Sequence, residues 1–240
     1  MHVLVVYAHP SRRSFNGALL DAVIEEVNSL GHTIEVSDLY AEGFNACGGP
    51  QDFIELQEPA QFHYQSEQKS AALSDNFVPE IAREQARLRR ADLLILQFPL
   101  WWGGVPAILK GWFDRVATYG VAYADGMRFE SGLFKGRRSL VSVTTGGTPA
   151  RFSEAGDYGP IEKVLWPVQQ LFLGYLGFAR VPPQVAWAVA RVEDEARREA
   201  VSALRLRVRE LLEAPYQRRE LPTPQALLAA VGNRDWRHKG

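Results

Sequence analysis

The chain has a single cysteine, no long apolar run and almost no net charge. Cys47 is the only cysteine in 240 residues, which excludes an internal disulfide framework and a thiolate-rich metal site. No stretch approaches the roughly 18 consecutive apolar residues of a membrane-spanning helix, and the opening MHVLVVYAH is too short and wrongly flanked for a signal peptide. The formal net charge is −1, so nothing draws the whole molecule to nucleic acid or to an anionic membrane. We therefore expect a cytoplasmic protein that binds no nucleic acid, does not insert into a membrane and holds no metal.

What the chain does contain is typical of a soluble globular protein. Hydrophobic residues make up 46% of it and charged residues 23%. A chain of this length fits one sizeable domain, or one domain with an appended tail. From Pro215 onward the sequence is polar and interrupted by prolines. We therefore place a domain at residues 1–213 and a tail, packed on the body or on a partner, at residues 214–240.

Residues 91–117, ADLLILQFPLWWGGVPAILKGWFDRVA, combine three features. Leu93 to Phe98 is a short apolar run, typical of a strand that is buried on both faces. A Trp-Trp-Gly-Gly turn follows at residues 101–104, and from Pro106 the apolar residues have helical spacing. The unit is therefore a strand, a loop and a helix, and such a loop lies at the carboxyl edge of an α/β sheet, where ligands bind.

The Trp-Trp-Gly-Gly turn is suited to the flat ring of a cofactor. Gly103 and Gly104 would let the backbone approach the ring, and their N–H groups could bond its heteroatoms. The alternative is that Trp101 and Trp102 pack in the core and that the glycines only turn the chain.

A second strand, loop and helix open the chain. Val3 to Ala8 is a buried strand by its apolar pattern, residues 18–30 have helical spacing before Gly31, and residues 33–39 alternate as a strand. This is a right-handed βαβ unit. Its loop, residues 9–16, carries hydroxyls, a histidine, two arginines and an asparagine just ahead of a helix N-terminus, which suits a phosphate or pyrophosphate. Neither G-x-G-x-x-G nor G-x-x-x-x-G-K-[ST] is present, and the alternative is a Ser14 cap with solvated arginines.

The same patterns predict the remaining elements. Residues 41–77 and 121–135 read as irregular, and a connection as long as the first of these is usually functional. The other predicted elements are a helix at 79–90, a strand at 139–143 ending in Thr-Thr-Gly-Gly, a helix at 161–176 interrupted or begun at Pro167, a fifth strand at 185–189 and a surface helix at 193–213.

Five strands that alternate with helices predict an α/β fold, a doubly wound parallel sheet with helices on both faces. In the flavodoxin-like order 2-1-3-4-5, the loops after the first, third and fourth strands meet at one edge. One of these loops suits phosphate and the other two suit a flat heteroaromatic ring. That combination, without a metal or a reactive thiol, indicates a flavin.

These motifs resemble those of the NAD(P)H:quinone oxidoreductase (DT-diaphorase) family, over roughly residues 2–190. The matching segments are His9 with Ser14-Phe15-Asn16, SDLYAEGFN (37–45), EPAQFHY (58–64), ADLLILQFPLWWGGVPAILKGWFDRV (91–116), SVTTGG (142–147), LWPVQ (165–169) and LGF (176–178). The resemblance implies a flavodoxin-like FAD enzyme, with FMN a less suitable cofactor. It implies a ping-pong reaction in which NAD(P)H and then a quinone use one position beside the flavin, and a homodimer with its active sites at the interface.

The resemblance also implies roles for individual residues. The cofactor-binding positions are His9, Ser14, Phe15, Asn16, Pro99, Leu100, Trp101, Trp102, Gly103, Thr144, Thr145, Gly146 and Gly147, with His63 and Arg197 near the adenine or phosphate end. Tyr123, Asp125 and Tyr175 would come from the neighbouring subunit to cover the substrate pocket.

The chain departs from the family pattern at several positions. The better-studied members of the family have a Tyr and a His, six residues apart, just after Thr-Thr-Gly-Gly, and Phe152 and Tyr158 stand at these positions here; other members carry Tyr near the second site. Phe152 cannot form a hydrogen bond, whereas Tyr158 keeps a hydroxyl, so Tyr158 is the candidate catalytic residue and Phe152 a pocket residue. Gly103 replaces a bulky aromatic residue and Trp101 a smaller polar one, which predicts a wider pocket and bulkier acceptors.

Other functions remain open at this point. A flavin-dependent azo or nitro reductase is chemically adjacent. A flavin-binding ancillary subunit that regulates a cation transporter belongs to another class. An electron-carrier flavodoxin, with FMN and one-electron cycling, fits the chain length and near-neutral charge poorly.

Overall fold

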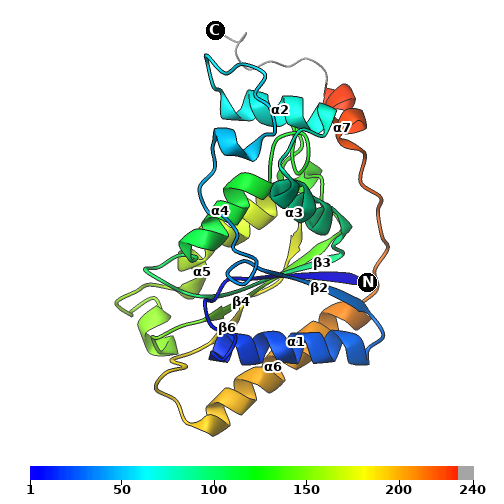
Figure 1. Ribbon diagram of the computed structural model, residues 1–240. Coiled ribbons are helices and arrows are strands. Elements are labelled where there is room, and N and C mark those ends of the chain that lie inside the picture. Colours follow the sequence, from blue (N-terminus) through cyan, green and yellow to red (C-terminus); the bar gives the residue numbers. More distant parts are fainter. Residues whose placement is uncertain (232–240) are drawn as a thin grey trace.

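Strand β1 (His2–Tyr7) carries apolar side chains on both of its faces. Val3, Val5 and Tyr7 enter one buried cluster, while Leu4 and Val6 enter another on the opposite side. A strand that is buried on both faces belongs in the interior of a parallel sheet, covered by helices above and below. The computed structural model, which describes residues 1–231, has this arrangement (Figure 1).

The strands pair in the order that the sequence predicts. They are β1, β2 (Thr33–Asp38), β3 (Leu93–Pro99), β4 (Arg138–Thr144), β5 (Ala179–Arg180) and β6 (Gln184–Ala186). The order is β2-β1-β3-β4-β5, with β6 also paired to β4, and every pairing is parallel. The flavodoxin-like doubly wound sheet is therefore confirmed.

The fifth strand differs from the prediction of a single strand at 185–189. It is divided into β5 and β6, which both pair with β4. Pro182 and Pro183 lie between the two pieces. Because proline has no N–H to donate, it interrupts the ladder and is tolerated only at a sheet edge.

Helices cover both faces of the sheet. On one face α1 (Phe15–Ser29) and α6 (Asp194–Glu213) pack against each other. The opposite face is covered by α3 (Pro79–Arg90) and α4 (Ala107–Val116), together with α5 (Ile161–Val164) and the π-helix η4 (Pro167–Gly174) (Figure 1). The helix predicted at 161–176 thus changes its winding at Pro167. Within residues 1–231, no helix is both long enough and apolar enough to cross a membrane.

Residues 41–77 are more ordered than the sequence pattern indicates, since they contain the turn η1 (Pro50–Asp52) and helix α2 (Tyr64–Ser74). The buried face of α2 consists of Glu67, Gln68 and two alanines. Because two of these residues are polar, the sequence lacks the apolar periodicity that would indicate a helix. Glu67 accepts hydrogen bonds from two preceding backbone amides at 2.9 and 3.0 Å. Short 3-10 turns also occur at η2 (Phe129–Ser131) and η3 (Pro149–Phe152).

A buried charge cluster attaches this segment to the helical layer. Arg115, only 2% exposed, lies 2.8 Å from Asp52 and 2.6 Å from Glu80. Tyr64 donates to the same Asp52 carboxylate. Burial raises the pKa of Tyr64, and the hydrogen bond to Asp52 raises it further, so the phenol stays a neutral donor. Loss of one partner from such a cluster would leave an uncompensated buried charge.

The C-terminal segment packs on the body of its own chain. The Tyr216 hydroxyl donates a hydrogen bond to Asp92 at 2.9 Å. The Arg89 guanidinium donates to two carbonyl oxygens, that of Pro222 in the tail and that of Val121 in the loop after α4. The segment predicted as a tail contains helix α7 (Pro224–Val231), which the polar, proline-interrupted sequence from Pro215 does not indicate. The division of the chain at residue 213 stays a prediction, and residues 232–240 lie outside the described part of the chain.

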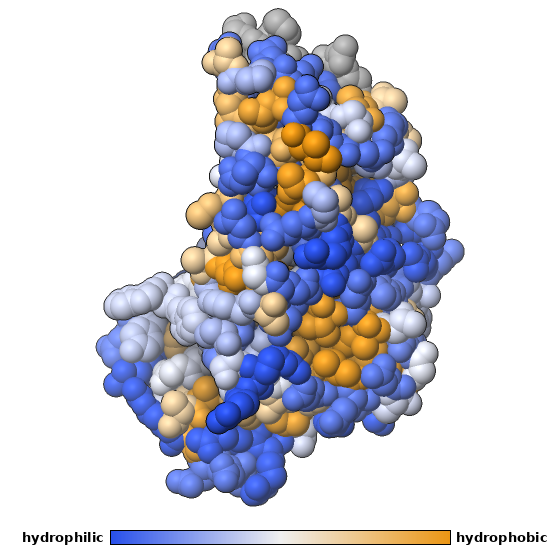
Figure 2. All heavy atoms as spheres, in the orientation of Figure 1, coloured by the Kyte–Doolittle hydropathy of each residue, from blue (hydrophilic) through white to orange (hydrophobic). Residues whose placement is uncertain are grey.

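Helix α7 closes the core at one end of the molecule, beside α2 (Figure 1). Leu227 and Leu228 are 1% and 7% exposed and belong to the same buried cluster as Leu4. A side chain at Gly120 would lie 3.0 Å from Leu228 and 2.9 Å from Ala72, so the three elements meet closely. Figure 2 shows apolar side chains at this end and a larger apolar patch lower on the same face.

Replacement of Leu228 by Ala tests this closure. We expect Leu228→Ala to lower the free energy of unfolding by about 2 kcal/mol, because it removes buried methyl groups and leaves a cavity. The measurement is urea unfolding, with hydrogen exchange to follow the amides of α7. Leu206→Ala on α6, where the side chain is 58% exposed, is the control, and equal losses in the two variants would contradict the assignment.

Candidate functional site

A pocket of about 500 Å³ lies where β1, β3 and β4 end. The loops that follow these three strands meet there, as the strand order requires. The predicted cofactor residues that line the pocket are His9, Ser14, Phe15, Asn16, Pro99, Leu100, Trp101, Thr144, Thr145 and Gly146. Val189 and Ala190 also line it and were not predicted. They follow β6, so the same strand-end argument applied to the fifth strand would have indicated them.

The N-terminus of α1 forms one wall of the pocket. Ser14 caps the helix, accepting a hydrogen bond from Gly17 N–H at 3.2 Å. A Cβ at Gly17 would lie 1.9 Å from the Arg12 carbonyl oxygen, so the loop depends on glycine to fold back so tightly. The first turn contains no acidic residue. First-turn amides have no partner inside a helix and carry partial positive charge, so this wall suits an anion.

The buried Asn16 side chain forms hydrogen bonds to side chains at the ends of β3 and β4. Its amide nitrogen donates to Thr144 Oγ1 at 2.9 Å, and its carbonyl oxygen accepts from Gln97 Nε2 at 2.8 Å. All three side chains are buried. Because Gln97 lies on β3, Thr144 ends β4 and Asn16 begins α1, these two hydrogen bonds fix the relative positions of the pocket walls.

The Trp-Trp-Gly-Gly segment is a tight hairpin turn. Trp101 and Gly104 exchange two backbone hydrogen bonds of 3.0 Å, and the central residues, Trp102 and Gly103, have φ of +50° and +71°. Positive φ at both central positions is the type I′ arrangement, in which glycine is favoured. Trp101 is 42% exposed and Trp102 is fully exposed, so the alternative in which these tryptophans pack in the core is wrong.

The loop after β4 is held rigidly and leaves backbone open to the pocket. Thr145 N–H donates to Ala186 in β6 at 2.9 Å, and Thr145 Oγ1 donates to the Gly147 carbonyl at 2.8 Å. No heavy atom lies within 4 Å of the position that a Cβ at Gly146 would take. A flat ligand could therefore approach the backbone at this loop closely.

A second pocket, of about 400 Å³, adjoins the first. Phe15 lines both, and the second is bounded by Arg197 and Arg198 at the start of α6. Arg197 donates to the carbonyl of Val189, which lines the first pocket, at 3.1 Å. A ligand longer than one pocket could thus extend from the strand ends toward these arginines.

Two further predicted residues lie near the pocket without lining it, and one lies elsewhere. Trp102 is at the exposed tip of its turn, and Gly147 follows the pocket residue Gly146. His63 caps α2, accepting from Ser66 N–H at 3.2 Å, and does not line either pocket. The cofactor roles of these residues stay predictions.

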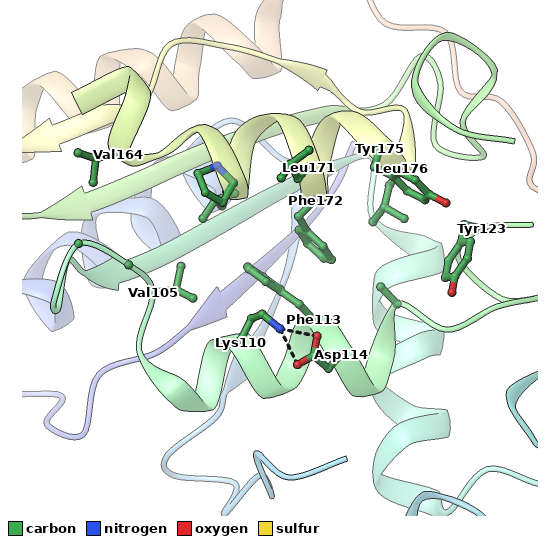
Figure 3. A pocket seen from close by; sticks show the side chains of 15 residues that line it. Val105, Lys110, Phe113, Asp114, Tyr123, Val164, Leu171, Phe172, Tyr175 and Leu176 are labelled. Carbon is green, nitrogen blue, oxygen red and sulfur yellow. Dashed lines mark hydrogen bonds and ion pairs between the residues drawn. The ribbon is translucent and has the colours of Figure 1, made fainter. Parts of the chain in front are cut away.

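An apolar groove of about 560 Å³ runs between α4 and η4 (Figure 3). Gly103 and Val105 line one part of it, and Tyr123 and Tyr175 lie toward the other end. Burial raises the pKa of Tyr123 to about 12, so its hydroxyl is a neutral donor at physiological pH. Asp125 accepts from the Tyr119 hydroxyl at 3.2 Å, which holds the loop that carries Tyr123. The predicted substrate residues Tyr123 and Tyr175 therefore lie close together, with ring centroids 5.7 Å apart.

Phe152 and Tyr158 pack against each other beside the Thr-Thr-Gly-Gly loop, with ring centroids 5.0 Å apart. A Cβ at Gly147 would lie 2.8 Å from Phe152 and 3.2 Å from Tyr158. Glycine at this position therefore brings both rings next to the pocket rim.

The parallel sheet, its strand order and the pocket at the strand ends define a flavodoxin-like protein. The profile of the family described as Flavodoxin-like fold matches residues 1–211. The ribosyldihydronicotinamide dehydrogenase (quinone) of Pongo abelii is 41% identical over 202 residues, which cover 84% of this chain and 87% of the relative. The NAD(P)H dehydrogenase (quinone) 1 of Cavia porcellus is 37% identical over 206 residues, covering 85% and 75%. The chain belongs to this flavodoxin-like family of quinone dehydrogenases.

A solved structure supports the same placement. A Klebsiella pneumoniae protein, described as a candidate quinone reductase, superposes with a TM-score of 0.85 at 36% identity. The match covers 92% of this chain and 89% of that protein. This chain therefore shares its overall fold with that protein.

Asn16→Ala tests the hydrogen bonds that join the pocket walls. The substitution leaves the buried Gln97 amide and Thr144 hydroxyl unpaired, which we expect to lower the free energy of unfolding by about 2 kcal/mol. Flavin affinity, measured by fluorescence titration, should fall as well. Asn28→Ala, at an exposed position on the same helix, is the matched control. Unchanged flavin affinity in Asn16→Ala would show that the pocket does not depend on this contact.

Proposed function

We propose that the protein is an FAD-dependent NAD(P)H:quinone oxidoreductase that transfers two electrons from NAD(P)H to a quinone by a ping-pong reaction. The observation that carries this proposal is the pocket in which the loops after β1, β3 and β4 meet. Relatives at 37–41% identity are named as quinone dehydrogenases, which supports the same activity for this chain.

The residues present fit a flavin dinucleotide. The capped start of α1 suits a pyrophosphate, and the backbone at residues 101–104 and 144–147 suits the edges of a flat ring. The second pocket, reached past Phe15 and bounded by Arg197, offers room beyond the pyrophosphate for an adenosine. This extra space is the reason for preferring FAD over FMN.

A bound flavin supplies the hydride chemistry, taking a hydride from NAD(P)H and passing it to the quinone. The chain contributes binding, orientation and a proton. First-turn amides of α1 would hold the phosphates, and the Asn16 hydrogen bonds would keep the two ring-facing loops at a fixed separation. Tyr158, whose ring lies beside Gly147, would donate a proton to the oxygen of the quinone.

The acceptor side of the site is wide. No heavy atom lies within 4 Å of the Cβ position at Gly103, where the family has a bulky aromatic residue. We therefore expect acceptors larger than a single quinone ring to bind. The full exposure of Trp102 leaves an aromatic surface against which such an acceptor can stack.

We further propose that the enzyme acts as a homodimer. Tyr123 and Tyr175 line the apolar groove, at the end away from Val105 (Figure 3). They do not line the strand-end pocket of their own chain. Leu171, which lines the groove, is 50% exposed, and Trp166, which precedes the groove residue Pro167, is 51% exposed. A second copy seated on this face would bury these side chains and bring its tyrosines to the neighbouring pocket.

Spectroscopy of the purified protein tests the activity. We expect the protein to carry FAD, identified by mass after extraction. Anaerobic addition of NADH or NADPH should bleach the flavin absorbance, and a quinone should restore it. Ribosyldihydronicotinamide is a third donor to compare, and azo and nitro compounds are the competing acceptors. A colourless protein that takes up no FAD would overturn the proposal, whereas flavin reduction without quinone turnover would favour an ancillary role.

Sedimentation of Leu171→Arg tests the dimer. A charge placed in an apolar interface should weaken association at least roughly tenfold, and quinone reduction should fall with it. Leu206→Arg, at an equally exposed leucine on α6, introduces the same charge away from the groove. A wild-type protein that sediments as a monomer while turning over quinone would contradict this assembly.

A further inference from the structure

The loop after the Thr-Thr-Gly-Gly segment brings Arg151 and Tyr158 together. Tyr158 N–H donates to the Arg151 carbonyl at 3.0 Å, and Arg151 Nη1 donates to the Tyr158 hydroxyl oxygen at 3.1 Å. A Cβ at Gly156 would lie 2.3 Å from the Arg151 carbonyl oxygen. Glycine at position 156 therefore lets the loop close and hold the two side chains across from each other.

The Tyr158 ring is also fixed from its other side. Phe152 packs against it with ring centroids 5.0 Å apart, and Phe152 in turn contacts Trp187 at 5.6 Å. Gly147 lies within van der Waals reach of both rings. The Tyr158 ring thus has a defined position beside Gly147, which follows the pocket residue Gly146, and the residue remains 50% exposed to water.

The guanidinium keeps its positive charge available to this hydroxyl. Among residues 1–231 Arg151 forms no ion pair, and Glu154 in the same loop is engaged by Lys163 at 3.1 Å. A guanidinium only donates, whereas a phenolic hydroxyl donates once and accepts twice. With Arg151 donating to its oxygen, Tyr158 must direct its own proton to another acceptor.

We propose that Arg151 is a positioning residue for proton donation by Tyr158 during quinone reduction, which rests on the function proposed above. The quinone gains two electrons and one proton as hydride, and a second proton from the Tyr158 hydroxyl. The O–H bond of Tyr158 breaks and an O–H bond forms on the substrate. The positive charge of Arg151 stabilises the phenolate left behind, and water returns the proton to it. The Arg151–Tyr158 pair thereby does the work for which the better-studied members of the family have a Tyr and a His.

The test compares Arg151→Gln, Arg151→Lys and Tyr158→Phe in the FAD-loaded enzyme by stopped-flow reoxidation with a quinone. A hydrogen bond from a charged donor is worth about 1.5–3 kcal/mol, so reoxidation should slow at least roughly tenfold in Arg151→Gln. Its solvent deuterium isotope effect should exceed that of the wild type, because proton donation then limits the rate. Lysine should restore part of the rate. Arg207→Gln controls for the loss of one charge, since Arg207 is an exposed arginine on α6 that pairs with Glu210.

A spectroscopic measurement tests the contact apart from turnover. In protein labelled with 3-fluorotyrosine, the Tyr158 resonance is the one lost in Tyr158→Phe. The chemical shift of this resonance should change in Arg151→Gln and stay the same in Arg207→Gln. An Arg151→Gln enzyme with the wild-type reoxidation rate and isotope effect would overturn this inference alone. A wild-type protein that binds no FAD, or whose flavin no nicotinamide reduces, would instead overturn the proposed function.

Discussion

The parallel register of three strands determines where everything else in the site can lie. Tyr7 pairs with Gln97, and Pro99 pairs with Thr144, so β1, β3 and β4 end within a few residues of one another. Their loops therefore lie at the same edge of the sheet. The buried Asn16, Gln97 and Thr144 side chains then convert this shared edge into a pocket of fixed width. A helix N-terminus on one side and exposed backbone on the other give that pocket two chemically different walls.

Much of the fold follows from local pattern in the sequence. The apolar runs of β1 and β3 are buried on both faces, and helix α3 has the bounds that its spacing predicts. The elements that the sequence pattern does not predict correctly have physical causes. Helix α2 buries Glu67 and Gln68, whose polar character is satisfied by hydrogen bonds that no periodicity can reveal. The fifth strand is divided by Pro182 and Pro183, and helix α7 depends on tertiary contacts of Leu227 and Leu228 rather than on a strong pattern of its own.

The site was predictable to the extent that it depends on strand ends. His9, Asn16, Trp101 and Gly146 come together because topology requires it, whereas His63 caps helix α2, which the polar pattern of residues 41–77 does not indicate. Side-chain exposure was the least predictable property. The two tryptophans read equally well as core or surface, and only the type I′ turn, with Trp102 at its tip, decides between them. The Arg151–Tyr158 contact depends on how a glycine-containing loop closes, which the spacing of its residues does not reveal.

The attachment of the tail also bears on how the molecule is made. Leu227 and Leu228 complete a core that already includes Leu4, so the earliest and latest parts of the described chain share one cluster. During synthesis, a ribosome still holding residue 228 in its exit tunnel carries a chain whose core is open above Gly120. The loop from Tyr119 to Asp125, which meets Leu228 at Gly120, therefore cannot complete its packing until residue 228 has left the tunnel. This end of the core therefore closes late, whereas the sheet edge that carries the strand-end pocket can form while the chain is still being elongated.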